Sequence, residues 1–491
     1  MALNLIRNSR VWFTTNVNAT TGVIAASGFT ADDAQTAAYE LQVLDGFTFS
    51  QNTNSEQVTV SEAGVAPVRG QRSFNTSLAP VDFSFSTYIR PRLSTDVLCE
   101  ESVLWNALLG TDLQNTAATF TGFSGAPTYT ATSGELTISG TGMQTFAVGT
   151  KLLVNGIGSN QAADLRLVNG PATVKTSSAL SLVLTMDNQS NAVSSTPTAV
   201  AGTLTSTNLK LYTSAWGKAA GSSIVSGHRS NTNQLQKFGM LILVDGVSYA
   251  IDNAALNEAT IDFGLDGIAT VQWTGQATAL RQLATSITTN TSGGFTAGVS
   301  GSFNQKNTSA GFITNKLSTC KLKTTNALGA GTVGTGYYLA ITGGSITISN
   351  NITYITPAIL GVVNEAVTYF TGTRSVSGTL NAYLNTGSIS TSFDGTTYTK
   401  GTGDLIADML TAKTTETEPM FGIELHVGGL AQVVRVELQM PSVTLGVPAI
   451  NTEQVVTTAI TFNAGGSTGA YSDRVYDLSQ TNELTVRYYA A

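Results

Sequence analysis

Alternation of apolar and polar residues is the commonest pattern along this chain. It is clear in FTFS (Phe47–Ser50), FSFSTYI (Phe83–Ile89) and ELTVRYY (Glu483–Tyr489). Because successive side chains of a strand point to opposite faces, this alternation predicts strands with one buried face. Apolar residues recur at helical spacing in only two segments that we single out, Asp96–Gly110 and Asp404–Lys413. We therefore predict an all-β protein with two helices.

One pattern occurs twice. FGMLILVDG (Phe238–Gly246) and FGIELHVGG (Phe421–Gly429) both fit F-G-x-x-[I/L]-x-V-x-G without a gap. Its signature residues are Phe238, Gly239, Val244 and Gly246 in the first copy and Phe421, Gly422, Val427 and Gly429 in the second. Self-similarity over a long period indicates a repeated structural unit. The repeat predicts that one half of the protein is a divergent copy of the other.

Weaker matches support the repeat because they keep the same order in both halves. They are Ile6–Asn8 with Ile313–Asn315, Thr14–Asn16 with Thr324–Asn326, Tyr39–Gly46 with Tyr338–Gly344, Phe47–Ser50 with Ile346–Ser349, and Phe83–Ile89 with Ser377–Leu384. Each predicted helix then falls between the last of these matches and the F-G strand of its own copy. Gly110 is the predicted stop of the first helix, and Asp404 is the predicted N-cap of the second.

The spacing of the matches indicates an insertion in the first copy. The early matches are about 300 residues apart and the F-G strands about 183, so the first copy holds roughly 115 extra residues. That segment has its own alternating stretches, divided by Gly, Asn and Ser turns. We predict two tandem β-sandwich or barrel domains, each with one flanking helix: residues 1–110 with 216–290, and residues 291–491. Residues 111–215 are predicted to form an inserted small β domain.

The connection from Gln51 to Ser73 is longer than an ordinary hairpin loop and mostly polar. A long protruding loop either moves freely or docks, and apolar residues inside this one favour docking. The candidate docking residues are Val58, Val60, Glu62, Val65, Val68, Arg69 and Arg72. The two arginines suit an ion pair with a neighbouring subunit. The counterpart connection in the second copy is Asn350–Asn364.

Composition narrows the function. Only 11% of residues are charged and the net charge is −7. General adhesion to a nucleic-acid backbone needs fields of Lys and Arg, so it is disfavoured. The N-terminal stretch lacks the apolar core of a signal peptide, and no stretch approaches a membrane span of about 18 apolar residues. We therefore expect a protein made and kept in a cytoplasm-like compartment, or released without secretion.

Candidate chemistry is sparse. Cys99 and Cys320 form no C-x-x-C pair, which argues against a zinc site or a disulfide framework. His228 lies in a Gly/Ser-rich segment, whereas His426 stands where the first copy has Leu243, which favours packing over catalysis. Glu100 and Glu101 are adjacent on the first predicted helix and are expected to be solvated. Gly331–Gly336 is glycine-rich but lacks the Lys and the following helix of a phosphate loop. We expect no enzyme activity, no cofactor and no metal.

Several segments resemble a known family. DGFTFSQ (Asp45–Gln51), SEAGVAPVRGQRSFNTSLAP (Ser61–Pro80) and FSFSTYIRP (Phe83–Pro91), followed by a helix from about Asp96, are similar to the tail tube (major tail) proteins of long-tailed bacteriophages. The resemblance covers less than half of the chain.

The resemblance implies a structural protein of the virion tail, assembled in the cytoplasm of the host bacterium. Subunits would pair their inner sheets into a barrel around a channel, and rings would stack into a tube for DNA ejection. A duplicated chain implies homotrimeric rings with pseudo-six-fold symmetry, with the inserted domain outside the tube. Partners would be copies of itself and other tail proteins (terminator, baseplate or tip, and sheath). DNA would pass through the lumen without specific binding, and no membrane is involved.

Two other classes of function stay open. A trimeric β-rich adhesin or receptor-binding tail spike would share the composition, but it should show a repeat of 20 to 50 residues or an aromatic sugar platform. A tail-associated hydrolase would need convergent acid and base residues, and the sequence shows none.

Overall fold

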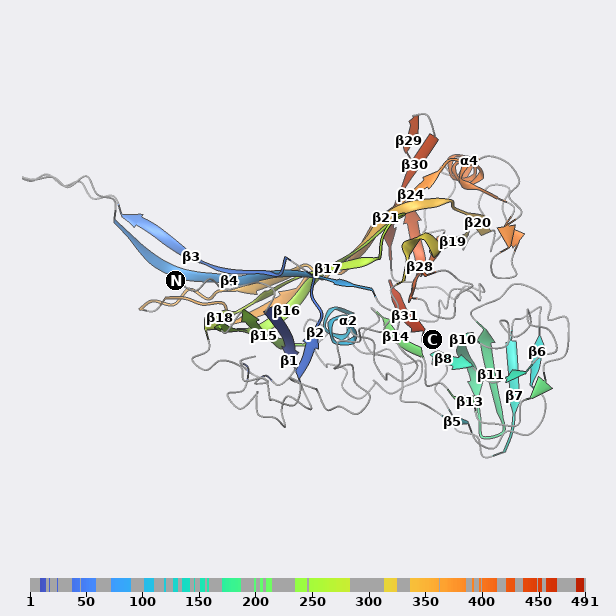
Figure 1. The fold of residues 1–491 in the computed structure, drawn as a ribbon, viewed down its shortest axis with the longest axis horizontal. Coiled ribbons are helices and arrows are strands. Elements are labelled where there is room, and N and C mark those ends of the chain that lie inside the picture. The colour runs from blue at the N-terminus through green and yellow to red at the C-terminus, as the bar shows by residue number, and fades with distance from the viewer. Residues whose placement is uncertain are drawn as a thin grey trace, which may run out of the picture.

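The computed structural model describes the following residues: 9–14, 17, 24, 38–44, 46–58, 72–89, 101–109, 119–120, 127–130, 135–141, 145, 151–154, 157–158, 170–186, 198–199, 204–205, 209–213, 235–244, 247–282, 313–324, 336–361, 363–385, 391–392, 397–398, 400–412, 421–428, 436–447, 449–452, 456–465 and 483–489. Strands dominate this part of the chain, as the alternation of the sequence predicted (Figure 1). None of the helices described there has both the length and the apolar character that crossing a membrane requires.

The strands of the first half belong to one large sheet. Its elements are β1 (Ser9–Thr14), β2 (Ala38–Leu41), β3 (Thr48–Val58), β4 (Arg72–Tyr88), α2 (Ser102–Leu109), β15 (Phe238–Val244), β16 (Val247–Gly264), β17 (Thr270–Ala277) and β18 (Ala279–Gln282). β1 pairs with β2 and β15, and β16 pairs with β15, β17 and β18. β3 pairs with β4, and β4 with β17.

The second half contributes the remaining main strands of the same sheet. Its elements are the 3₁₀ helix η2 (Asn315–Leu317), β19 (Thr319–Thr324), β20 (Gly336–Tyr338), β21 (Ile341–Ser349), β22 (Ile352–Ile355), β23 (Thr368–Thr371), β24 (Ser375–Tyr383), β25 (Thr391–Ser392), β26 (Thr397–Tyr398), α4 (Thr402–Ala412), β27 (Phe421–Val427), β28 (Val436–Leu445), β29 (Ala449–Thr452), β30 (Val456–Ala464) and β31 (Thr485–Tyr489). β22–β23 and β25–β26 are separate hairpins.

Each pairing within the first half has a counterpart in the second. β19 pairs with β20 and β27, β28 pairs with β27, β30 and β31, β21 pairs with β24, and β24 with β30. Even a register irregularity recurs, between Phe238 and Met240 in β15 and between Phe421 and Ile423 in β27. Bulges are designed features of a sheet rather than defects, so their recurrence at one place is informative.

The registers correct two of the sequence matches. Tyr39 lies opposite Phe13, and Tyr337 lies opposite Leu322, so Tyr337 rather than Tyr338 is the counterpart of Tyr39. Around Phe47–Ser50 the predicted match is two residues out of register, because Phe49 pairs with Phe83 while Ile346 pairs with Gly378. A shift of two keeps the same side chains on the buried face, which is why alternation alone could not detect it.

The hydrophobic core runs without a break from one half into the other. Helix α2 packs on it, with Trp105 edge-on to Trp273 at a ring separation of 4.9 Å. The Trp105 indole Nε1 donates to the hydroxyl of Tyr488 in β31 at 2.9 Å. Both tryptophans and Tyr488 are fully buried. The first helix therefore completes its packing against the last strand of the chain.

Both predicted helices are present in part. Of Asp96–Gly110, residues Ser102–Leu109 are helical, and residues 90–100 lie outside the described part. The second helix begins at Thr402, so the prediction of Asp404 as its N-cap is wrong. Asp404 Oδ2 instead accepts from the backbone N–H of Gly401 at 2.9 Å, as the third residue of a capping box does.

The inserted segment contains β5 (Thr119–Phe120), β6 (Thr128–Thr130), β7 (Glu135–Ser139), β8 (Lys151–Val154), β9 (Ile157–Gly158), β10 (Gly170–Ser177), β11 (Ser181–Met186), β12 (Thr198–Ala199), β13 (Leu204–Thr205) and β14 (Leu209–Thr213). A five-stranded sheet runs β6-β7-β11-β10-β8. β14, although it falls within residues 111–215, pairs with β31 in the large sheet.

Candidate functional site

A continuous sheet crosses from one half of the molecule to the other. Its strand order is β3-β4-β17-β16-β21-β24-β30-β29. The junction between the halves is the pairing of β16 with β21, from Glu258 opposite Ser349 to Gly264 opposite Gly343. Figure 1 shows this sheet as a long curved band, with the β3–β4 hairpin projecting from one end. We call these eight strands the long sheet.

One face of the long sheet is mainly polar, with Ala459 of β30 as an apolar position opposite Asn381. It carries hydroxyl, amide and carboxylate side chains: Thr48, Ser50, Asp82, Ser84, Ser86, Thr270, Gln272, Thr274, Gln276, Glu258, Thr260, Asp262, Ser345, Thr347, Ser349, Ser377, Thr379, Asn381, Thr461 and Asn463. Asp82, Glu258 and Asp262 are the charged residues of this set, and it contains no Lys or Arg. The polar face is therefore hydrophilic and carries a net negative charge.

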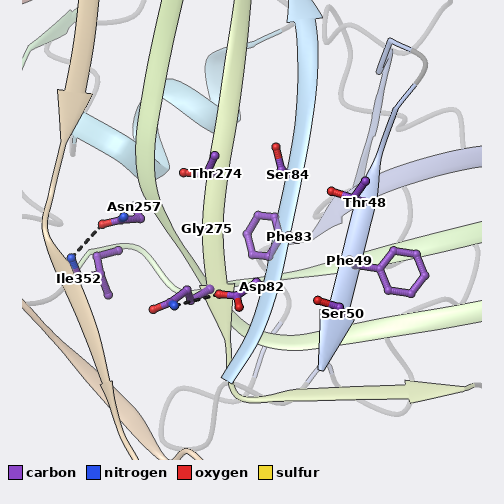
Figure 2. A pocket seen from close by; sticks show the side chains of 11 residues that line it. Thr48, Phe49, Ser50, Asp82, Phe83, Ser84, Asn257, Thr274, Gly275 and Ile352 are labelled. Carbon is purple, nitrogen blue, oxygen red and sulfur yellow. Dashed lines mark hydrogen bonds between the residues drawn. The ribbon is translucent and has the colours of Figure 1, made fainter. Parts of the chain in front are cut away.

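Hydrogen bonds between neighbouring strands hold side chains on this face. Gln276 Nε2 donates to Asp82 Oδ1 at 2.9 Å, and the hydroxyls of Thr260 and Thr347 lie 3.3 Å apart across the junction between the halves. Figure 2 shows part of the face, where Asp82 and the residues around it line an open depression of about 360 Å³. The depression does not bring together an acid, a base and a nucleophile, so it offers no catalytic constellation.

The opposite face of the long sheet is apolar and contains an exchanged pair. Phe83 of β4 lies opposite Gly275 of β17, and a Cβ atom at Gly275 would come within 2.3 Å of the Phe83 ring. In the second half Gly378 of β24 lies opposite Phe462 of β30, and a Cβ at Gly378 would come within 2.5 Å of that ring. The phenylalanine and the glycine have changed places between equivalent strands. In each half, the opposed pair therefore consists of one phenylalanine ring and one glycine.

The two ends of the long sheet have unpaired edges. Within the described residues, β3 pairs only with β4, and β29 pairs only with β30. β21, the counterpart of β3, uses its other edge to join β16. An unpaired edge offers backbone donors and acceptors to another strand.

Polar contacts also fasten the second half to the first. Arg374 Nε donates to Asn350 Oδ1 at 2.8 Å, and Asn350 Nδ2 donates to the carbonyl oxygen of Leu108 at the end of α2 at 3.0 Å. Arg374 Nη2 reaches the same carbonyl at 3.4 Å. Burial lowers the pKa of Arg374, and Glu483 opposes that shift. These donors satisfy helix carbonyls that have no partner within the helix.

The β22–β23 hairpin docks on the first half through two tyrosines. The Tyr354 hydroxyl donates towards the carbonyl oxygens of Asn253 and Gln276 at 2.7 and 2.9 Å, and the Tyr369 hydroxyl donates to Leu235 at 2.8 Å. Burial raises the pKa of Tyr354 well above its ordinary value. The paired strands of the hairpin are therefore anchored to the first half through the hydroxyls of Tyr354 and Tyr369.

The outer part of that hairpin is strongly apolar and exposed. Leu360 is 100% exposed, Ile355, Ile359, Val363 and Val367 around the turn are each at least 43% exposed, and Phe370, 49% exposed, lies in β23 opposite Thr353. We call these six residues the apolar tip. Its neighbour Asn364 accepts from the backbone N–H of Leu78 at 2.8 Å, which places the tip beside the base of the β3–β4 hairpin. Exposed apolar groups gathered in this way mark interaction surfaces.

The described residues of the connection predicted from Gln51 to Ser73 belong to a hairpin, which we call the arm. Gln51–Val58 belong to β3, and Arg72 and Ser73 belong to β4, so the prediction of a loop is wrong for these residues. Asn52–Gln57 are exposed, which explains why the sequence lacks the alternation of a half-buried strand. Among the candidate docking residues, Val58 and Arg72 lie opposite each other, and Val60, Glu62, Val65, Val68 and Arg69 lie outside the described part.

The residues of the repeated F-G strand serve the core. Phe238, Phe421 and Val427 are buried there, and Val244 packs against it. Gly239 leaves room for Ile24, whose Cγ1 would lie 2.3 Å from an added Cβ. Gly422 is buried in β27, whereas Gly246 and Gly429 fall outside the described residues.

Other predicted residues are distributed as follows. Glu101 is only 2% exposed, so the expectation that it is solvated is wrong. Its backbone carbonyl oxygen accepts from the Trp105 N–H, which places Glu101 at the start of α2. The helix dipole favours a negatively charged side chain at that end. Burial, with the nearby Glu424 carboxylate, raises the pKa of the Cys320 thiol to about 12, so this thiol is unreactive. His228, Cys99 and Glu100 lie outside the described residues.

His426 is fully buried, and the sequence missed its surroundings. It lies between Glu424 and Glu437 and near Lys321, all three at most 3% exposed. Lys321 is on β19, Glu424 on β27 and Glu437 on β28. Their closeness depends on the register between separate strands, which no local pattern contains.

The all-β fold and the long sheet suit a structural protein, and sequence comparison adds a likeness to a phage tail protein. The chain is 24% identical over 471 residues to "Tail tube protein pb6" of Escherichia phage T5, in an alignment that spans 94% of this chain and 73% of that relative. No family model matches the chain. The similarity confirms the predicted resemblance to phage tail tube proteins and the predicted location in the virion tail.

Proposed function

We propose that this chain polymerises into rings that stack into the tube of a phage tail, a conduit for DNA ejection. The observation that carries the proposal is the β16–β21 junction. It joins one half to the next by strand pairing, and the same kind of edge is left unpaired on β3 and β29. If β29 of one chain accepts β3 of the next, the sheet continues from chain to chain and can close into a barrel.

The ring is proposed to contain three chains. Residues 1–110 with 216–290 form one tube domain, residues 291–491 form the second, and residues 111–215 form an insertion on the outside. The recurring strand pairings and the exchange of Phe83 and Gly275 for Gly378 and Phe462 support a duplicated domain. Three such chains would provide six similar junctions, and a closed ring leaves no edge for uncontrolled pairing.

The polar face of the long sheet is proposed to line the channel. It carries Asp82, Glu258 and Asp262 among hydroxyls and amides, and none of the described side chains assigned to it is a Lys or an Arg. Binding to DNA comes mainly from Lys and Arg that neutralise phosphates. A wall without them would let DNA slide without being retained. The apolar face then lies in the body of the wall, where the core is.

Stacking of rings is assigned to the β3–β4 arm and the apolar tip, which lie side by side. The arm includes the candidates Val58 and Arg72, which lie opposite each other in β3 and β4. Other tail proteins, namely a terminator, a baseplate or tip protein and a sheath, are proposed partners at the tube ends and outer surface. A structural role without catalysis is proposed from the likeness to a tail tube protein.

Proline substitutions in β29 test ring closure. The backbone N–H groups of adjacent residues in a strand point to opposite edges. One of the variants Ile450→Pro and Asn451→Pro therefore removes a backbone hydrogen bond to β30. The other, the outward variant, removes only an N–H group on the unpaired edge of β29. The outward variant should melt like the wild type yet stay monomeric in native mass spectrometry, while the wild type gives trimers and tubes in electron microscopy. Tubes of normal length from both folded variants would contradict the assigned edge.

The same micrographs separate the alternative function. A trimeric adhesin or receptor-binding spike would give isolated trimers that never stack at high protein concentration, whereas a tube protein should give stacked rings. The mass of an isolated ring distinguishes three chains from six.

A further inference from the structure

The contact between the two halves has a second component beside the β16–β21 pairing. The β22–β23 hairpin follows β21 in the chain and lies on the first half, where Tyr354 and Tyr369 pack with Ala255 in one buried cluster. At the start of the hairpin, the backbone N–H of Ile352 donates to Asn257 Oδ1 at 2.8 Å (Figure 2). The hairpin therefore binds the same half to which β21 is paired.

The arm is the first-half counterpart of this hairpin. Val81 of β4 and Val376 of β24 are equivalent, because the exchanged phenylalanine and glycine follow them at the same distance. The same number of residues separates Phe74 from Val81 and Tyr369 from Val376. Tyr369 is 4% exposed, whereas Phe74 is 52% exposed. An aromatic side chain thus stands at the same place in both hairpins, covered in one and exposed in the other.

The second half carries the counterpart of the surface that the β22–β23 hairpin covers. Leu256 and Leu445 are equivalent, because they lie opposite the exchanged residues of β17 and β30. Thr444 therefore corresponds to Ala255. Ala255 is fully buried, whereas Thr444 is exposed, and so is Asn463, which lies opposite Thr444 in β30. The surface that is covered in the first half is open in the second.

The strand edges show the same difference in exposure. Ile261 of β16 lies opposite Ile346 of β21 at the junction and is fully buried. Ile450 of β29 is the counterpart of Ile261, because it follows Thr444 at the distance at which Ile261 follows Ala255. Ile450 is 49% exposed. One chain therefore contains one covered copy of this contact and, at the two ends of the long sheet, the two separate parts of a second copy.

We propose that Phe74 of one chain packs on the second half of a neighbouring copy, against Thr444 and Asn463. Tyr369 packs against Ala255 in the equivalent way within one chain. The inference rests on the proposed pairing of β29 with β3 of the next chain, because that pairing brings the arm to this surface. The partner is a second copy, since β3 and β29 lie at opposite ends of the long sheet. Phe74 is thereby assigned to a contact within the ring.

The chemistry of the open surface suits a ring without a hydroxyl group. Tyr369 donates its hydroxyl to the carbonyl oxygen of Leu235 at 2.8 Å, whereas Phe74 has no such donor. Its contact must therefore be apolar. Val447, just beyond the end of β28, is 55% exposed and adds apolar surface near Thr444 in the chain. Exposed apolar side chains on both parts are what such a contact would remove from water.

The first test identifies the neighbour of Phe74 directly. Rings are assembled from a mixture of unlabelled and isotope-labelled full-length chains in which Phe74 is replaced by the photo-cross-linking residue p-benzoylphenylalanine. We expect cross-linked peptides, identified by mass spectrometry, that join residue 74 of one chain to residues 444–447 or Asn463 of another. The same replacement at Leu180, which is 64% exposed in the inserted segment, is the control and should not reach these residues.

The second test measures assembly. Phe74→Ser should raise the protein concentration needed for half of the chains to form rings at least about tenfold, because buried aromatic anchors dominate the affinity of interfaces. Phe74→Tyr installs the residue of the second half and should assemble like the wild type. Melting curves of the monomers should be the same for both variants, since Phe74 is exposed in the single chain.

The outcomes separate this inference from the proposed function. Rings in which residue 74 cross-links elsewhere or to nothing overturn the inference and leave the ring standing. Phe74→Ser that assembles at wild-type concentrations does the same, and this comparison decides if the bulk of p-benzoylphenylalanine blocks assembly. Wild-type protein that forms no rings overturns the proposed function, and the inference with it.

Discussion

The outer face of the β1–β15–β16 sheet carries an apolar cluster around Trp12 and Leu241, and the equivalent place on β19–β27–β28 is charged. Trp12 and Leu241 stand where Lys321 and Glu424 stand in the other half. The strand pairings are nevertheless the same. What the two halves share is the inward face, where Phe13 and Met240 have their counterparts in Leu322 and Ile423, all buried. The pairing framework is therefore set by the backbone and the inner face, and the outer face was free to change its chemistry.

The largest effect is expected from moving one charge into the apolar half. Leu241→Glu would place a carboxylate against Trp12 and Ile24, where the Arg10 guanidinium is already engaged over the Trp12 ring, 5.0 Å from its centroid. An uncompensated buried charge costs about 3–5 kcal/mol, and we expect that loss in the free energy of unfolding, measured by urea denaturation. Leu241→Met is the matched control and should cost less than about 1.5 kcal/mol. A Leu241→Glu protein as stable as the control would show that this face is not closed to water.

A large effect with a rescue is expected from the exchanged pair. Phe83→Gly alone leaves a cavity beside Gly275 and should cost at least about 3–5 kcal/mol. Gly275→Phe alone forces two rings into the space of one and brings its Cβ within 2.5 Å of the Ala255 carbonyl oxygen, a clash that the double variant keeps. The double variant recreates the arrangement of Gly378 and Phe462, so we expect it to recover about 2–3 kcal/mol of coupling in a double-mutant cycle. Additive losses would mean that the two halves do not pack their pairs alike.

A smaller loss is expected at the contact between the halves. Arg374→Leu removes the donors to Asn350 and to the Leu108 carbonyl while keeping apolar volume. Hydrogen bonds to charged groups contribute about 1.5–3 kcal/mol, and we expect a loss in this range. Arg374→Lys keeps the positive charge but lacks the several N–H donors of the guanidinium, so it should recover only part of the lost free energy. Hydrogen exchange of α2 should rise in Arg374→Leu; an unchanged rate would exclude Arg374 as its anchor.

The smallest effect on stability is expected at the apolar tip. Leu360 is fully exposed, so Leu360→Ser should change the free energy of unfolding by less than about 0.5 kcal/mol. The same variant should shorten tubes in electron microscopy and leave single rings, because it weakens an apolar contact between rings. Exposed Leu180 of the inserted segment provides the control, since Leu180→Ser should leave tube length unchanged. Equal shortening in both variants would point to a general loss of solubility.

The sequence predicted the features that depend on short-range pattern. Alternation found the strand around Phe83 and Phe85, and the F-G motif located β15 and β27. Helix positions were found because apolar spacing is local, although the start of α4 was misplaced by the capping box around Asp404. The polar residues of each strand were also visible in the sequence.

Features that depend on register between distant strands could not be predicted. Asp82, Glu258 and Asp262 share one face only because β4, β17 and β16 lie side by side. The cluster around His426 needs β19, β27 and β28 in one alignment, and a single histidine in a strand carries no sign of that. The arm was mistaken for a loop because Asn52–Gln57 have no buried face to impose alternation.

The bond between Trp105 and Tyr488 spans 383 residues of sequence. A ribosome makes the chain from its N-terminus, so α2 emerges long before the strand against which it must close. Native contacts this remote form slowly, since the intervening chain must first be brought together. Closure of the core therefore waits until Tyr488 has been synthesised, and a chain that stops before residue 449 lacks both β29 and β31. Truncated products would be unable to extend a growing filament.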